Sequence, residues 1–414
     1  MQRTTLFFLG GAALIFVIVQ AMISFGLLND FYVNILLLAS VYAIVGLGLN
    51  LIYGFNGQFS LGQWGFYAIG AYAAGDITYW WTLDKSAHAL MIALLAVLFC
   101  GAAILLLRKL LSRVRGVDAL SAFTLYLVVV IFLVFIAIQL GQALSPAVSG
   151  LLSLLPDGLS LQIVFFLAVL IAGLMAAEIS FLFGLPVLTL GSDYFGIATL
   201  GLTIIVKVLL DNSDTLLPFP EMKGARGMVG IPEVTNWFWA FAFLLVIVVV
   251  VRNLLHSSYG RAIISVREDE IAAKAMGIDI AHYKNLSFVL GSLFAGLAGG
   301  LYAHINGFLH PNTFNFIKSF DPMIIIVMGG LGSITGTLGA SFAWAFILEG
   351  LLRVILPQGA ETWRFVVYPL ILLLIMLLRP KGLMGEIELP FLRQVLPPLK
   401  PKAQPEETQA EVKP

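Results

Sequence analysis

The chain has 414 residues, of which 60% are hydrophobic and only 11% are charged, and its mean hydropathy is +0.99. A soluble domain usually carries about 25% charged residues, so this composition excludes a soluble protein. The 23 basic and 23 acidic residues cancel, and this balance gives no sign of nucleic-acid binding.

Long uninterrupted apolar runs predict an all-α polytopic membrane protein with about 10–11 transmembrane helices. A transmembrane barrel would show alternating segments of about ten residues instead. The basic N-terminus precedes about twenty apolar residues, which favours a retained first span over a cleaved signal peptide. The expected spans are 6–25, 31–53, 60–80, 89–107, 119–140, 160–182, 188–210, 236–251, 284–308 and 362–378.

Basic residues orient these spans. They cluster in the stretches 108–115, 252–284 and 379–402, and short basic segments stay on the cytoplasmic side of a membrane. With the N-terminus inside, counting spans places the first two clusters in the cytoplasm. The third cluster follows only if the segment 320–352 reverses direction or crosses twice, and the C-terminus is then also cytoplasmic.

The stretch "NLIYGFNGQFSLGQWGF" (50–66) interrupts the apolar pattern with glycine and polar residues. We expect a turn near 54–58 at the cytoplasmic end, leading into a translocation pathway, because polar residues at membrane depth tend to mark such pathways. Two alternatives are hydrogen bonding between helices without solute contact and glycines that only shape the backbone. The candidate pathway residues are Gly54, Asn56, Gly57, Gln58, Ser60, Gly62 and Gln63.

A second glycine-rich stretch, "MGGLGSITGTLG" (328–339), lies inside 320–352. It predicts a re-entrant segment in which 321–331 enters, turns near 329–332, and leaves as 335–352 on the same side. The alternative is two ordinary helices packed through small residues. Paired glycine-broken segments point to a transport site and are consistent with an inverted repeat. The candidate pathway residues in this second stretch are Gly329, Gly330, Gly332 and Ser333.

The stretch 252–284 is too long for a simple connection between helices. We expect a short amphipathic helix from about Ser265, with acidic residues 268–270 in its first turns and Gly277 at its end. Lys274 would pair with Glu270, and Val266, Ala273, Met276 and Ile278 would form its apolar face. An acid-rich helix with alanines favours docking on a partner protein over docking on the membrane surface.

Four blocks of this sequence carry a family resemblance. Glu270 to Ala273 followed by Gly277 resembles the "EAA" loop of ABC importer permeases, and the blocks 41–75, 191–210, 260–303 and 321–344 resemble permeases for branched-chain amino acids. The similarity is to the M-type (LivM-like) subunit. The sequence departs from the family pattern at Trp64, Ile204, Lys207, Lys223 and Arg226.

The resemblance implies an ATP-driven importer that moves branched-chain amino acids or a related small solute into the cytoplasm by alternating access. Its partners would be a second, H-type permease in a heterodimer, two ABC ATPase subunits and a periplasmic binding protein in a bacterial inner membrane. The chain itself would be no enzyme, with no catalytic residue, cofactor or metal site, and it lacks the GxxxxGK[ST] phosphate loop. Residues that would couple it to the ATPase are Arg267, Glu268, Glu270, Ala272, Ala273, Met276 and Gly277.

Two further alternatives stay open. Similar importers carry urea, short amides or aromatic acids, and an ion-coupled secondary transporter could use the same broken helices. Such a carrier would need a carboxylate near the membrane midplane. We expect residues 1–385 to form the transmembrane permease domain, with the stretch 252–284 as its coupling loop, and 386–414 to be a disordered cytoplasmic tail, since the latter is polar and rich in proline.

Overall fold

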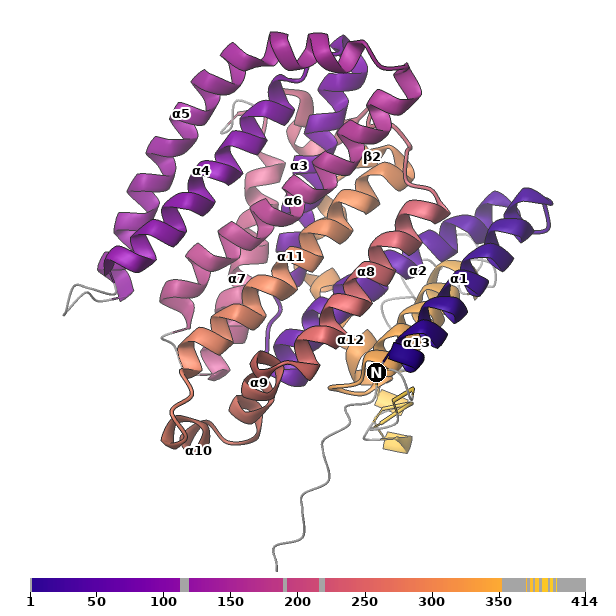
Figure 1. Cartoon of the computed structure of the whole chain (residues 1–414), viewed down its shortest axis with the longest axis vertical. Coiled ribbons are helices and arrows are strands. Elements are labelled where there is room, and N and C mark those ends of the chain that lie inside the picture. Colours follow the sequence, from indigo (N-terminus) through magenta and orange to yellow (C-terminus); the bar gives the residue numbers. More distant parts are fainter. Residues whose placement is uncertain are drawn as a thin grey trace, which may run out of the picture.

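The computed structural model confirms an all-α polytopic membrane protein (Figure 1). Apart from one two-stranded sheet, the described elements are helices. The structure describes residues 2–111, 119–188, 192–215 and 220–351, and beyond these 370, 373–374, 377–379, 382–385, 388–389 and 392.

Thirteen α-helices lie in the described residues, interrupted by shorter elements. They are α1 (Gln2–Ser24), α2 (Asp30–Leu49), α3 (Gln63–Asp84), α4 (His88–Leu111), α5 (Ala119–Ser153), α6 (Asp157–Val187), α7 (Ser192–Asp211), α8 (Trp237–His256), α9 (Ser258–Glu268), α10 (Glu270–Ala275), α11 (Ile280–Asn306), α12 (Phe320–Gly329) and α13 (Ile334–Ala345). The π-helices are η1 (Asn50–Phe55) and η6 (Phe346–Leu351); the 3₁₀-helices are η2 (Pro220–Met222), η3 (Gly224–Arg226), η4 (Pro311–Phe314) and η5 (Phe316–Ser319). Strand β1 (Met228–Val229) pairs antiparallel with β2 (Phe308–Leu309).

Seven helices of the described part are long and apolar enough to cross a membrane: α2 with η1, α4, α5, α6, α7, α8 and α11. Helix α5 continues well beyond the predicted end of its span at 140, and it contains Pro146. Its 35 residues correspond to about 50 Å, more than the hydrocarbon core of a bilayer. The expected span 362–378 lies mostly outside the described residues.

Helix α11 forms the centre of the bundle and packs against α2, α3 and α6. Glycines permit these contacts, because the backbones approach too closely for larger side chains. A Cβ on Gly70 of α3 would lie 2.1 Å from the carbonyl oxygen of Gly296, and one on Gly48 of α2 would lie 2.6 Å from that of Gly291. Close approach through small residues is a common way for membrane helices to associate.

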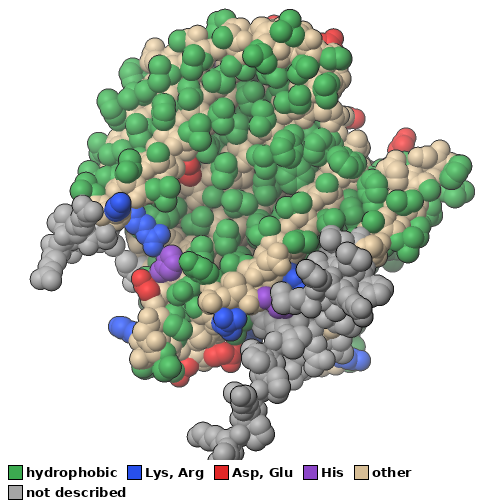
Figure 2. Space-filling view, in the orientation of Figure 1, with side chains coloured by type: hydrophobic (Ala, Val, Ile, Leu, Met, Phe, Trp, Pro, Cys, Tyr) green, Lys and Arg blue, Asp and Glu red, His purple; other side chains and the backbone are tan. Residues whose placement is uncertain are grey.

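The two ends of the bundle differ in character. The N-terminus, α9 and α10 lie at one end of the molecule, and β2 lies at the other end of α11 (Figure 1). Hydrophobic side chains cover most of the visible surface, and basic side chains gather toward the α9–α10 end (Figure 2). This distribution matches the apolar belt of a membrane protein with one basic end.

Helices α12 and α13 form a hairpin with its turn at residues 330–333, close to the predicted position. Gly329 and Gly336 face each other so closely that a Cβ on Gly329 would lie 2.4 Å from the carbonyl oxygen of Gly336. Helix α12 has only 10 residues, about half of what a helical span needs, whereas α13 continues directly into the π-helix η6 as far as Leu351. We call the turn of this hairpin, Gly330–Ser333, the tip.

Candidate functional site

The two glycine-broken segments meet at Asn50. The side chain of Asn50 is fully buried at the start of the π-helix η1. Its Nδ2 donates to the carbonyl oxygen of Ser333 at 2.9 Å and to Oγ1 of Thr337 at 2.8 Å, and its Oδ1 accepts from the N–H of Gly332 at 2.9 Å. One amide thus joins the first broken segment to the second, and π-helical distortions of this kind are frequent at functional sites.

Glycines 54 and 332 make this junction sterically possible. A Cβ on Gly54 would lie 1.7 Å from Oδ1 of Asn50 and 2.6 Å from the backbone nitrogen of Gly332. Gly332 has φ +80°, a left-handed conformation that a residue with a side chain adopts only under strain. The Asn50 side chain therefore contacts three predicted pathway residues, Gly54, Gly332 and Ser333.

Arg267 connects the same junction to the loop between α8 and α11. Its Nη1 donates a hydrogen bond to the carbonyl oxygen of Gly54, although Arg267 lies more than two hundred residues away. A Cβ on Gly332 would lie 2.9 Å from the same Nη1, and one on Gly57 would lie 3.3 Å from Cγ of Arg267. The last turn of α9 thus rests against both broken segments.

The segment of α9 and α10, residues 258–277, consists of two helices where we expected one. Helix α9 ends at Glu268, and Asp269 begins α10 by accepting hydrogen bonds from the N–H groups of Ile271 and Ala272 at 2.8 and 3.0 Å. An aspartate in extended backbone is a preferred N-cap, which explains the break. Arg267 and Glu268 therefore belong to the end of one helix and not to the acidic start of another.

The predicted helix end at Gly277 is confirmed. Gly277 has φ +81°, its N–H bonds the carbonyl oxygen of Lys274 at 3.0 Å, and the N–H of Ile278 bonds that of Ala273 at 3.1 Å. This pair of bonds is the Schellman arrangement, which requires a left-handed residue and so favours glycine.

Glu270 pairs with Lys284 of α11 at 2.5 Å, so the expected pairing with Lys274 is wrong. Sequence spacing favoured Lys274 on the same helix, but the short α10 folds back toward α11 and brings the more buried Lys284 within reach. The acidic group of the "EAA" stretch thereby attaches α10 to the central helix of the bundle.

The apolar side chains of this segment point in two directions. Val266 and Ala273 are buried in the chain itself, with exposed fractions of 2% and 4%. Met276 of the predicted face and the neighbouring Ile271 are instead 82% and 83% exposed. Ala272 is also exposed, and of residues 270–277 only Ala273 is buried.

The other predicted pathway residues form a second neighbourhood. A Cβ on Gly62 would lie 3.0 Å from Cβ of Thr199 of α7, and Oγ1 of Thr199 accepts from the N–H of Leu61 at 3.0 Å. Ser60 Oγ accepts from the N–H of Gly62 at 3.3 Å. The structure therefore places Ser60 and Gly62 against α7 rather than at the Asn50 junction.

Two amides of the first stretch, Asn56 and Gln63, are buried with incomplete hydrogen bonding. Asn56 donates to Oε1 of Gln58 at 2.9 Å, while Oδ1 of Asn56 has no hydrogen-bond partner in the described residues. Neither amide atom of Gln63 has a hydrogen-bond partner there, although this side chain is 1% exposed.

The two remaining predicted pathway residues lie in the second stretch. Gly329 packs against Gly336, and Gly330 packs against Gly382.

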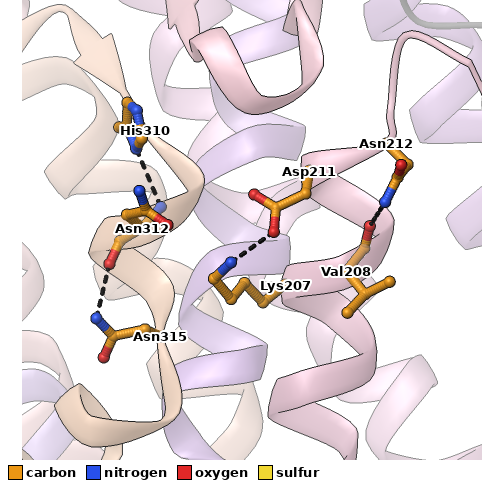
Figure 3. Close-up of polar contacts among 7 residues, drawn as sticks. All are labelled: Lys207, Val208, Asp211, Asn212, His310, Asn312 and Asn315. Carbon is orange, nitrogen blue, oxygen red and sulfur yellow. Dashed lines mark hydrogen bonds and ion pairs between the residues drawn. The ribbon is translucent and has the colours of Figure 1, made fainter.

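Helix α7 ends in a polar cluster near η4, at the far end of α11 from α10. Lys207 and Asp211 form an ion pair at 2.5 Å, with Asn212 bonded to the carbonyl oxygen of Val208 (Figure 3). Opposite them, the residues from His310 to Asn315 form local hydrogen bonds of 3.1 and 3.0 Å among themselves. No dashed line joins the two groups (Figure 3). Lys207, a departure from the family pattern, is thus neutralised within its own helix.

Comparison with known proteins identifies the family. The family described as "Branched-chain amino acid transport system / permease component" matches residues 31–149 and 116–377. The chain belongs to this family. A high-affinity branched-chain amino acid permease protein, LivM of Escherichia coli, is 28% identical over 85% of this chain and 69% of its own length.

More distant relatives agree. A probable LivM of Methanocaldococcus jannaschii is 23% identical over 58% of this chain and 72% of its own length. LivH of Escherichia coli is 25% identical over 46% of this chain and 64% of its own length. No solved structure matches the chain. The family membership agrees with the expected M-type (LivM-like) resemblance and with a permease component in a membrane.

Sequence reasoning missed two residues of the site, Asn50 and Lys284. Asn50 offered a signal, since it is a lone amide in an apolar run four residues before Gly54. Lys284 offered none, because it is only the last of several basic residues in the stretch 252–284.

Proposed function

We propose that this chain is the membrane permease subunit of an ATP-driven importer that works by alternating access. The observation that carries the proposal is Arg267: one side chain of the α9–α10 segment contacts both glycine-broken segments. A force applied to α9 would reach the pathway through a single charged group. Chains of hydrogen bonds and packed side chains of this kind can carry coupling between distant sites.

The α9–α10 segment is suited to dock on an ATPase subunit. Ile271 and Met276 expose large apolar side chains on a short helix that is too small to cross a membrane. Exposed Lys274 and Glu268 surround them with mixed charge rather than the basic character of a membrane-surface helix. Ala272 and Gly277 are exposed and small, which supports close approach by a groove. Ala273 is buried against the chain itself and fixes the orientation of this helix.

The relatives support the proposed partners and solute. The family consists of permease components, and relatives named LivM and LivH both match this chain, which supports a second, H-type permease as partner. Two ABC ATPase subunits and a periplasmic binding protein would complete the importer. Branched-chain amino acids or a related small solute are the proposed cargo, with N- and C-termini in the bacterial cytoplasm.

We assign the pathway to the buried polar residues around the two breaks. Asn56, Gln58 and Gln63 are buried among apolar helices. Oδ1 of Asn56 and both amide atoms of Gln63 have no partner in the described residues, and buried polar groups without partners are costly there. A passing solute with amino or carboxylate groups would satisfy them for part of the transport cycle. Gly54, Gly57, Gly62, Gly329, Gly330 and Gly332 shape the backbone of that route.

A charge exchange tests the coupling role. In the assembled importer, Glu270→Ala and Lys284→Ala should each lower uptake roughly tenfold while ATP hydrolysis continues, because each breaks the ion pair between α10 and α11. The double variant Glu270→Lys with Lys284→Glu should recover uptake, since it restores an opposite-charge pair. Uptake and hydrolysis are measured together in proteoliposomes.

Asp157→Ala is the matched control. It breaks an exposed ion pair with Lys85 outside the α9–α10 segment, and it should leave the ratio of uptake to hydrolysis unchanged. Normal uptake by Glu270→Ala would contradict the coupling role of this residue. Uptake by the chain alone in an ion gradient would favour a secondary transporter instead.

A further inference from the structure

The described residues between 382 and 392 lie against the hairpin of α12 and α13. The N–H of Leu383 donates to the carbonyl oxygen of Met328 at 2.8 Å, and that of Met384 donates to the carbonyl oxygen of Gly329 at 3.2 Å. These carbonyls belong to the last turn of α12, where helix ends leave acceptors unpaired. We call residues 382–385 together with Glu388, Leu389 and Leu392 the C-terminal strap.

Glu388 of the strap caps the other helix of the hairpin. Its Oε1 accepts from the N–H of Ile334 at 2.5 Å, and its Oε2 accepts from the N–H and the hydroxyl of Thr335 at 3.1 and 2.5 Å. The Thr335 hydroxyl oxygen in turn accepts from the N–H of Leu389 at 3.1 Å. A carboxylate at a helix N-terminus is favoured both by its charge and by these donors.

Packing reinforces these bonds. A Cβ on Gly382 would lie 2.6 Å from the Cα of Gly330, so the strap backbone touches the tip directly. Leu392 is 3% exposed and belongs to the main hydrophobic core. The strap is thus attached both at the tip and in the bundle.

The same tip is held from the α9 side. The N–H of Gly332 donates to Asn50, and Gly332 lies against Arg267. The C-terminal strap contacts Gly330, Ile334 and Thr335. If α9 moves during transport, the tip cannot stay in contact with both Arg267 and a stationary strap. One set of contacts must break.

We propose that Glu388 is a positioning residue for transport, which holds the tip in its present arrangement through the N-terminus of α13 and releases it in each cycle. This inference rests on the proposed importer function. The rival is a static strap that only satisfies the backbone of a broken helix. A static strap would remain bound throughout the cycle.

Locking the strap separates these two cases. Leu389 and Thr335 lie close enough for a disulfide, which joins Cα atoms up to about 7 Å apart. In a Cys100→Ser background, which removes the chain's one cysteine, the pair Thr335→Cys and Leu389→Cys is introduced into the assembled importer. Oxidation should abolish uptake, and reduction should restore it.

Uptake by the oxidised pair at the rate of the reduced pair would overturn the proposal in favour of the static strap. Each single cysteine variant serves as a control, since oxidation should not change its uptake. If neither the wild-type chain nor the reduced pair supports ATP-dependent uptake, the proposed function fails rather than the strap.

Substitution of Glu388 gives an independent readout. Glu388→Ala removes the hydrogen bonds that the strap accepts from Ile334 and Thr335. ATP hydrolysis without solute should then rise, and uptake per ATP should fall roughly tenfold, as expected for lost charge-assisted bonds. Glu388→Asp keeps the carboxylate and should recover part of the coupling. Glu406→Ala removes an acidic group later in the chain and should change neither quantity. An unchanged uptake-to-ATP ratio in Glu388→Ala would contradict the positioning role.

Discussion

At the scale of single residues, the structure concentrates the function-bearing contacts on a few polar groups. Asn50 is the clearest case, because one buried amide makes three hydrogen bonds to a segment more than 280 residues away. An amide can do this since it donates and accepts at once. Replacing it leaves the Gly332 N–H without its acceptor, which is costly in a buried site. Ser333 C=O loses one donor but still accepts from the N–H and the hydroxyl of Thr337.

Two substitutions of Asn50 test this junction. Asn50→Asp keeps the size but loses the two donors, and Asn50→Leu loses all three bonds. Each should lower the stability of the purified complex by about 1–3 kcal/mol, seen as a lower unfolding midpoint in detergent. Asn212→Leu is the control, since Asn212 is exposed and its amide bonds only the carbonyl oxygen of Val208 within the described residues. Equal midpoints for Asn50→Leu and the control would contradict the proposed junction.

At the scale of elements, the turn and the helix end marked by glycine were predicted correctly, whereas one helix start and the long-range contacts were not. The hairpin turn at 330–333 was predicted because glycines cluster there, and the helix end at Gly277 because glycine follows the last apolar residue. The break at Asp269 was missed, although an aspartate before a glutamate and alanines is also a capping signal. The run of acidic residues 268–270 was instead interpreted as the first turns of a single helix, so the start of a second helix at Asp269 was not predicted.

Gly54 tests whether the meeting of the two breaks matters. Gly54→Ala introduces a Cβ that overlaps Oδ1 of Asn50 and the nitrogen of Gly332, so η1 and the tip must separate. Overpacking of this kind costs about 1–3 kcal/mol, and we expect uptake to be lost with it. Gly150→Ala in α5 is the matched control, because a Cβ there meets no atom within 4 Å. Wild-type uptake by Gly54→Ala would show that the junction tolerates separation.

At the scale of the whole molecule, hydropathy and charge predicted the architecture, while the assembly of the site required coordinates. Apolar runs gave helix positions to within a few residues for most spans, since a membrane permits little else than helices. They could not show that Arg267, Asn50 and Glu388 all reach one hairpin, because nothing in a local pattern encodes contacts across hundreds of residues. The repeat relation of the two broken segments stays a prediction.

The orientation of the molecule in the membrane also stays a prediction, and its two ends make it testable. Met276 lies exposed at the α9–α10 end, and Asn212 lies exposed at the end of α7 near η4, the far end of α11. Basic residues gather near the first of these ends, which the positive-inside rule assigns to the cytoplasm (Figure 2).

Single cysteines at these two positions read the orientation directly. In a Cys100→Ser background, Asn212→Cys should react with a membrane-impermeant maleimide added to intact cells whose outer membrane has been permeabilised. Met276→Cys should react only after the inner membrane is opened. The reverse pattern would place α9 and α10 outside, away from any cytoplasmic ATPase, and the coupling role of Glu270 would then be untenable. Labelling of both positions from one side would contradict the assignment of α11 as a helix that crosses the membrane between them.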